Sequence, residues 1–132
     1  MTTTWKTLLI LAALALALTL AACAGGSGGD PAKTVERYLQ AKVEGDEQVV
    51  RSLLCSEMEA NAFQEINAFT SVSGAHIEGM KCQWKEGADV VACEGKIVAT
   101  YGAEETEFPL TAYRVVKEDG EWKWCGETAL TQ

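Results

Sequence analysis

The chain has 132 residues, of which 48% are hydrophobic, and its 11 basic and 19 acidic residues give a formal net charge of −8 at pH 7. This length allows one folded domain with one hydrophobic core. The acidic balance argues against nucleic acid as a partner and against electrostatic adhesion to anionic lipid, because both need clustered basic residues. A solubilising surface is the simplest interpretation of the charge.

The first 22 residues have the pattern of a signal peptide. One basic residue, Lys6, precedes an uncharged apolar run over residues 8–20. A membrane-spanning helix needs about 20 apolar residues, so the run is too short to cross a bilayer and fits the hydrophobic region of a signal peptide. Lys6 would be lost with this segment, and the mature chain would carry 10 basic and 19 acidic residues, a formal charge of −9.

The segment Leu-Ala-Ala-Cys over residues 20–23 resembles the lipobox of bacterial lipoproteins. The resemblance implies that the Cys23 thiol receives a diacylglycerol lipid and that the chain is cut between Ala22 and Cys23. Cysteine suits this chemistry because its thiolate is the nucleophile. The alternative is ordinary secretion, with cleavage near Ala22 or Ala24 and a free thiol at Cys23.

Residues 23–30 are expected to form the lipidated cysteine and a Gly/Ser-rich linker. Two or three acyl chains anchor a protein stably, and a flexible linker of this length reaches about 15 Å. We therefore expect an extracytoplasmic lipoprotein, in the cell membrane or outer envelope, whose partner through Cys23 is the membrane. Its folded domain would occupy residues 31–132.

Helix signals dominate the first part of this domain. Asp30-Pro31 predicts a helix start, with a cap followed by proline at the first position, and Gly45 predicts the end of that helix. Asp46 predicts the cap of a second helix. Four apolar residues mark the inner face of the first helix: Val35, Tyr38, Leu39 and Val43.

A third helix is predicted after the second. Ser56 and Glu59 have the spacing of a capping box. The apolar residues that follow at core spacing are Met58, Ala62, Phe63, Ile66 and Phe69. Residues 71–75 are predicted to be a loop.

The apolar period then changes to two, which predicts strands over 76–84, 89–101, 105–117 and 121–130. The turns between them lie at 86–88, 102–103 and Asp119-Gly120, of which the last is a strong hairpin signal. Helices followed by consecutive hairpins predict an α+β domain, with the N-terminal helices packed on a four-stranded antiparallel meander.

Three segments carry a family resemblance: Pro-Ala-Lys-Thr-Val-Glu-Arg-Tyr-Leu over 31–39, Glu44-Gly45-Asp46, and the hairpin over 115–124. The order of elements and these segments resemble the cystatin-like, nuclear-transport-factor-like superfamily, and within it small lipoproteins of unknown function with a lumazine-binding-like domain. The resemblance implies a curved sheet wrapped around a long helix, forming a cone with a pocket. It implies no particular chemistry, because this fold has many functions.

Four cysteines remain beside Cys23, and export places them where disulfides form. A zinc site is the alternative, but no Cys-x-x-Cys pair supports it. With the shortest turns, Cys82 faces Cys93, while Cys125 faces Arg114 on the same side of the sheet. Cys93 and Cys125 would then be two strands apart, roughly 9.6 Å, beyond the reach of about 7 Å for a disulfide. The pairs Cys82–Cys93 and Cys55–Cys125 are therefore predicted.

These registers leave one conflict. They place Trp122 and Trp124 on the face opposite Cys125, although the cysteine face carries most of the apolar strand residues. A β-bulge in the last strand, or a sheet covered on both faces, would resolve it.

No catalytic, cofactor or metal motif is present. His76 is expected at a strand end and Tyr38 in the core, although related isomerases carry an oxyanion-donating tyrosine in the first helix. The acidic cluster at the predicted 102–103 turn is expected to be solvated; its members are Glu104, Glu105 and Glu107. Tyr38, Trp122 and Trp124 are the candidate ligand-binding residues if the cone holds a pocket.

The favoured hypothesis is a non-catalytic envelope module that binds a small ligand or another protein. The alternatives are a small isomerase or dehydratase that uses the cone pocket, and a purely structural envelope protein.

Overall fold

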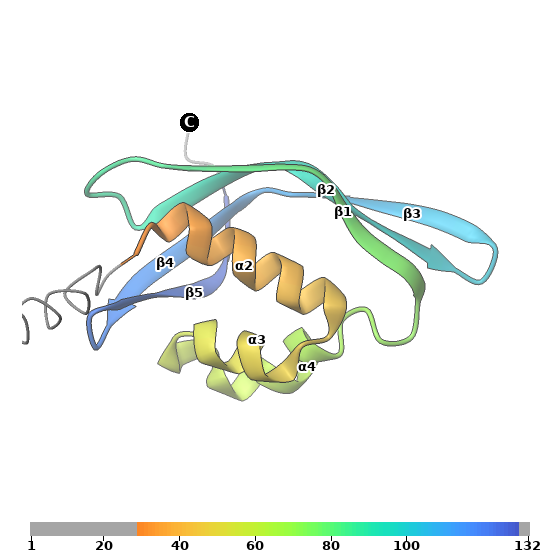
Figure 1. Ribbon diagram of the computed structural model, residues 1–132, viewed down its shortest axis with the longest axis horizontal. Coiled ribbons are helices and arrows are strands. Elements are labelled where there is room, and N and C mark those ends of the chain that lie inside the picture. Colours follow the sequence, from red (N-terminus) through yellow and green to blue (C-terminus); the bar gives the residue numbers. More distant parts are fainter. Residues whose placement is uncertain (1–28, 130–132) are drawn as a thin grey trace, which may run out of the picture.

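A computed structural model of the chain describes residues 29–129. The predictions for the signal peptide, for cleavage between Ala22 and Cys23, and for the lipid on Cys23 lie outside the described residues. Within 29–129, helices come first and an antiparallel sheet follows, and the curved sheet wraps around the first helix (Figure 1).

Helix α2 (Pro31–Glu44) begins and ends where the sequence predicts. The Asp30 carboxylate accepts a hydrogen bond from the Ala32 N–H at 2.9 Å, and Pro31 occupies the first helical position. Gly45 ends the helix in the left-handed conformation (φ 70°), which glycine adopts without steric cost. Helix α3 (Glu47–Leu53) follows at once, capped by Asp46, whose carboxylate accepts from the Val49 N–H at 3.0 Å.

The third helical segment differs from its prediction. It consists of a 3-10 helix, η1 (Ser56–Asn61), and a short α4 (Ala62–Ile66). The capping box does not form, because Ser56 donates both its backbone N–H and its hydroxyl to the Glu118 carboxylate. Phe63, predicted to be in the core, is 74% exposed, since the change from 3-10 to α geometry turns Ala62 and Ile66 inward instead.

The sheet has five strands: β1 (Ser73–Trp84), β2 (Val90–Tyr101), β3 (Glu104–Pro109), β4 (Ala112–Glu118) and β5 (Glu121–Thr128). Their order is β1-β2-β4-β5, and β3 pairs with the far part of β2. The predicted strand 105–117 is thus two strands, because the pairing is irregular at Leu110 and Thr111, although both residues still hydrogen-bond to β2. The predicted loop 71–75 is shorter, since β1 already begins at Ser73.

Glycine allows the sheet to bend beside β1. A β-bulge places two residues of β1 opposite Gly95 of β2. A Cβ atom on Gly95 would lie 2.6 Å from the backbone oxygen of Glu78, so only glycine fits there. The bend contributes to the curvature of the sheet around α2 (Figure 1).

The break between β3 and β4 resolves the conflict over the tryptophans. Strand β3 has the predicted register, with Ile97 opposite Phe108, but β4 is shifted by one residue, so that Ala112 faces Ala92 and not Cys93. A shift of one residue exchanges the two faces of a strand. Tyr113 and Val115 therefore face the core, and so does Trp124, which pairs with Val115.

Strand β5 also contains a β-bulge, but the bulge comes after Trp122 and Trp124 in the chain. Cys125 and Gly126 lie together opposite Arg114. The prediction that all three sheet cysteines share one face is wrong, because Cys82 and Cys93 contact the core cluster whereas Cys125 reaches out to the segment after α3.

Candidate functional site

The interior of the cone contains an aromatic stack. Tyr38 of α2 and Trp124 of β5 have ring centroids 4.0 Å apart and planes inclined by 12°. Their exposed fractions are 0% and 2%. Tyr113 of β4 lies beside the stack, 6.4 Å from the Trp124 ring. Two of the three predicted ligand-binding residues therefore lie together, and both are core residues.

A polar cluster borders this stack. The Tyr38 hydroxyl donates to the Glu65 carboxylate at 2.5 Å, and the Lys42 ammonium donates to the same oxygen at 2.7 Å. Lys42 also lies over the Trp124 ring, 5.9 Å from its centroid. Burial, and next the hydrogen bond to Glu65, raise the pKa of Tyr38 far above its ordinary value. The phenol is therefore held protonated as a hydrogen-bond donor.

Trp124 carries an unsatisfied donor within this interior. Its indole Nε1 is buried and has no hydrogen-bond partner among the described residues. A groove of about 410 Å³ opens where β3 gives way to β4; it is lined by Leu110, Thr111, Glu127, Thr128 and Ala129. The negative charge of Glu127 acts on both Tyr38 and Tyr113, which links the groove electrostatically to the interior.

Trp122, the third predicted ligand-binding residue, lies elsewhere. Its ring packs edge-on against Trp84 at 5.7 Å, and Lys117 lies over it at 5.9 Å. The pair is half-buried at the outer part of the core. Within the described residues, no aromatic contact joins Trp122 to the Tyr38–Trp124 stack.

Two disulfides fix the fold around this interior. They join Cys82 to Cys93 and Cys55 to Cys125, the same pairs that the strand registers predicted. Cys82 and Cys93 are directly opposite on β1 and β2.

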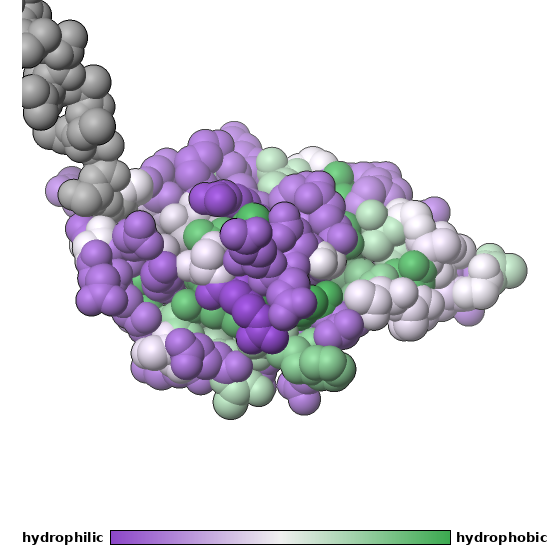
Figure 2. All heavy atoms as spheres, turned by 60° about the horizontal axis from the view of Figure 1, so that its bottom comes forward, coloured by the Kyte–Doolittle hydropathy of each residue, from purple (hydrophilic) through white to green (hydrophobic). Residues whose placement is uncertain are grey.

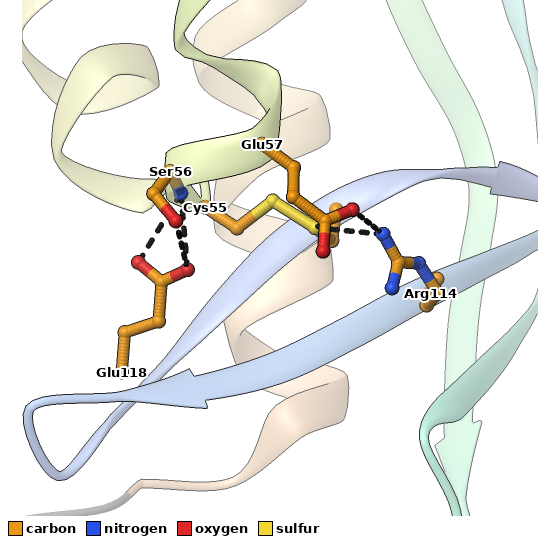
Figure 3. The surroundings of a disulfide bond; sticks show 6 residues. Cys55, Ser56, Glu57, Arg114 and Glu118 are labelled. Carbon is orange, nitrogen blue, oxygen red and sulfur yellow. Dashed lines mark hydrogen bonds and ion pairs between the residues drawn. A yellow bond between two sulfur atoms is a disulfide. The ribbon is translucent and has the colours of Figure 1, made fainter.

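The Cys55–Cys125 bridge fastens the helical layer to β5 (Figure 3). The Cys55 N–H donates to the Trp124 carbonyl at 2.9 Å. Two sets of polar contacts flank the disulfide in Figure 3. On one side Arg114 forms an ion pair with Glu57, and on the other Ser56 donates a hydrogen bond to Glu118.

The other candidate residues are at the surface. His76 is half exposed at the start of β1; one ring nitrogen donates to the Gly74 carbonyl at 2.7 Å and the other lies 3.1 Å from Glu78. These contacts, the carbonyl first, raise the pKa of His76. Glu104, Glu105 and Glu107 are exposed on β3, and Glu107 pairs with Lys96.

The structure also reveals a surface that the sequence reasoning missed. The exposed large hydrophobic residues within 29–129 are Phe63, Tyr101 and Phe108, at 74%, 44% and 37%. Phe108 contacts Tyr101 and Phe69 edge-on, at 6.3 and 6.0 Å. We call Tyr101, Phe108 and Phe69 the aromatic patch; Phe63, exposed on α4, makes no aromatic contact with these three among the described residues. The only signal of it in the sequence was the β2–β3 hairpin, since Tyr101 precedes the turn and Phe108 lies further along the second strand.

The patch lies away from the start of the domain. The described chain enters at the left in Figure 1, whereas the β2–β3 hairpin projects at the right, beyond the helices. Figure 2 shows apolar atoms reaching the surface between the helical layer and this hairpin. Large apolar side chains gathered at a surface commonly mark an interaction site.

Residues 29–129 contain no group of three acidic, histidine or cysteine side chains arranged to hold a metal ion. Over the same residues, no helix has the length and apolar character needed to cross a membrane.

No protein-family model and no curated protein matches the chain. Among solved structures, it is similar to an NTF2-like protein of unknown function in nutrient uptake from Rhodospirillum rubrum, with a TM-score of 0.50 and 17% identity over 79% of this chain and 100% of that one. At this identity the likeness concerns the fold alone. Together with the cone of helices and curved sheet, it shows that the domain has the α+β fold of the NTF2-like, nuclear-transport-factor-like type that the sequence resemblance predicted.

Proposed function

We propose that this protein is a lipid-anchored envelope lipoprotein whose folded domain binds another envelope protein without catalysing a reaction. The aromatic patch is the observation that carries the binding part. Its exposed rings, Tyr101 and Phe108, belong to the β2–β3 hairpin, which projects at the side of the domain opposite the point where the described chain begins. A tether at that point would hold the patch facing away from the membrane.

The sequence and the two disulfides support the proposal that the protein is exported and lipid-anchored. The apolar run ends in Leu-Ala-Ala-Cys, and a Gly/Ser-rich segment follows directly. Both disulfides of the domain are of the kind that persists outside the cytoplasm, which agrees with export.

The lipid anchor is tested by replacing Cys23, the residue that would accept the lipid. In cells fed with a clickable palmitate analogue, the wild-type protein should be labelled and remain with the membranes, whereas Cys23→Ala should lose both properties. A Ser27→Ala variant in the linker is the matched control and should behave as wild type. Membrane association without labelling, or labelling of Cys23→Ala, would contradict the proposal.

The binding part is tested by photo-crosslinking in intact cells. A photoreactive phenylalanine at position 108 should yield one discrete crosslinked protein, and Tyr101→Ser should reduce its yield several-fold. The same probe at Gln40, exposed on α2, is the control. Absence of a product from position 108, or equal products from both positions, would contradict protein binding at the patch.

A small polar ligand is the second candidate, favoured by the unpaired Trp124 Nε1 in the interior and by the groove of about 410 Å³ between β3 and β4. An unsatisfied buried donor is costly, so an acceptor atom from a ligand would stabilise it. Native mass spectrometry of gently purified protein would detect a bound molecule. The indole ¹⁵N–H signal of Trp124 should then shift when that molecule is removed.

A further inference from the structure

The outer edge of β3 is open for pairing. Strand β3 pairs with β2 along one side and, among residues 29–129, with no strand on the other. The β2–β3 hairpin extends past the helices, so no helix covers this edge (Figure 1). An unpaired edge presents a row of backbone donors and acceptors to another chain.

The other two edges of the sheet are partly covered. On β1, the Cys82 N–H already donates to the Glu36 carboxylate of α2 at 3.2 Å. On β5, the segment after α3 pairs through Leu54 and Cys55, whose N–H donates to the Trp124 carbonyl. Strand β3 is therefore the edge whose backbone donors and acceptors are free to pair with an added strand.

The backbone groups that face this open edge can be identified. The Leu110 N–H donates to the Gly95 carbonyl at 2.9 Å, so every second residue of β3 from Leu110 backward bonds to β2. That set includes Phe108 and Thr106. The N–H and C=O groups of Glu105 and Glu107 consequently point outward. Pro109, which has no N–H, belongs to the outward-pointing set, the position that proline tolerates in a strand.

The side chains of β3 alternate between the two faces, and Glu104 at the start of the strand lies on the same face as Thr106 and Phe108. Phe108 and Thr106 lie on the concave face, where Phe108 contacts Phe69 and Tyr101. Glu105 and Glu107 lie on the convex face. There Glu107 pairs with Lys96, which also lies 3.4 Å from Glu78 on β1. With His76 neutral, this part of the convex face carries three carboxylates against one ammonium group, and its net charge is negative.

We infer that β3 accepts, as an added strand, an extended segment of the partner in which basic residues alternate with apolar ones. The alternation places apolar side chains beside Phe108 and Thr106, and basic side chains beside Glu105 and Glu107, where opposite charges on neighbouring strands stabilise pairing. This inference rests on the proposed protein-binding function and specifies the partner's chemistry.

Charge argues against a second copy of this chain as the occupant. Two β3 strands side by side would bring glutamates of like charge next to one another, which destabilises pairing. The same charges that prevent self-association favour a basic partner.

The probe is the capped peptide Lys-Val-Lys-Val-Lys-Val-Lys, added to the folded domain of the mature chain with its disulfides intact. We expect the amide signals of Glu105 and Glu107 to shift and to become protected from hydrogen exchange. The Glu-Val counterpart should bind at least tenfold more weakly. Equal binding of the acidic peptide, shifts confined to another edge, or self-association of the domain through β3 would overturn the inference.

Two further peptides separate strand addition from simple charge attraction. N-methylation of one alternate set of residues removes the donors that face β3 and should abolish binding, whereas methylation of the other set should leave it intact. Equal binding of both methylated peptides would overturn strand addition. In the protein, Glu105→Gln/Glu107→Gln should weaken binding several-fold and reduce its salt dependence, while the matched pair Glu44→Gln/Glu47→Gln should not.

Failure of this inference is distinguishable from failure of the proposed function. A crosslink from position 108 in cells, combined with no peptide binding at β3, would refute strand addition and leave protein binding standing. Absence of that crosslink in cells would refute protein binding at the patch.

Discussion

The indole of Trp124 lies flat against the phenol ring of Tyr38, with centroids 4.0 Å apart, and joins the last strand to the first helix. Residues 86 positions apart in the chain thus form the centre of the core. Both rings are almost fully buried, and the Tyr38 hydroxyl is hydrogen-bonded to Glu65. This stack is where the helical layer and the sheet depend on one another most directly.

Trp124→Ala should therefore destabilise the domain by about 3–5 kcal/mol, because it leaves a large cavity in the core. Tyr38→Phe keeps the stack and removes one hydrogen bond to Glu65, which retains Lys42, so about 1–2 kcal/mol is expected. Urea denaturation measures both. Phe63→Ser, at a site 74% exposed, is the control and should change stability by less than about 0.5 kcal/mol.

The two disulfides should contribute unequally. Cys55 and Cys125 are 70 residues apart and Cys82 and Cys93 are 11 apart. Loop-closure entropy predicts stabilisation of about 4 and about 3 kcal/mol respectively. Replacing both cysteines of a pair with serine, in two separate variants, tests this by urea denaturation. A larger loss from Cys82→Ser/Cys93→Ser would contradict the ranking.

Glu118 should stabilise the start of η1. Its carboxylate accepts from the Ser56 N–H at 3.0 Å and from the Ser56 hydroxyl at 2.9 Å, which replaces the capping box that the sequence predicts. Glu118→Ala should cost about 1–2 kcal/mol, the usual effect of losing hydrogen bonds to a charged group. Glu121→Ala, in the same hairpin, is the control. Equal effects of the two variants on the urea midpoint would show that the cap is unimportant.

His76 should make stability depend on pH. The Gly74 carbonyl, and next Glu78, raise its pKa in the folded state above the ordinary value of about 6.5. A raised pKa means that the stabilisation is complete below the unfolded pKa and is lost as pH rises through the folded pKa. NMR titration of the ring should give a pKa above that of the unfolded chain. In His76→Gln, this decline of stability as the pH rises above the unfolded pKa should be absent; an unchanged decline would contradict the assignment.

Much of the fold was predictable because local signals determine it. Asp30-Pro31 and Gly45 define the ends of α2, and Asp46 caps α3. These signals are local, because an Asp side chain accepts a hydrogen bond from a free N–H group at a helix start, and Gly adopts the left-handed conformation that ends a helix. The Asp119-Gly120 turn gives the register of the last hairpin, with Glu118 opposite Glu121. The cysteine pairs followed from two such registers and a distance limit.

The candidate site was predictable only in part. Tyr38 and Trp124 were correctly singled out as aromatic residues of the interior, but Trp122 lies with Trp84 instead. The polar partner of Tyr38, Glu65, had no signal, because it lies on α4, 27 positions along the chain. The aromatic patch was missed because Phe69 has the spacing of a core residue, and Tyr101 and Phe108 lie within predicted strands.

The sequence by itself determined the ends of α2, the turns and the cysteine pairing, because these depend on neighbouring residues or on short registers. Tertiary structure decided which face of each strand is buried. The alternation of apolar residues fixes faces within a strand, but the break at Leu110 and Thr111 shifts β4 by one residue relative to β2. That single shift turns Trp124 into the core, because a change of one residue in register exchanges the two faces of a sheet.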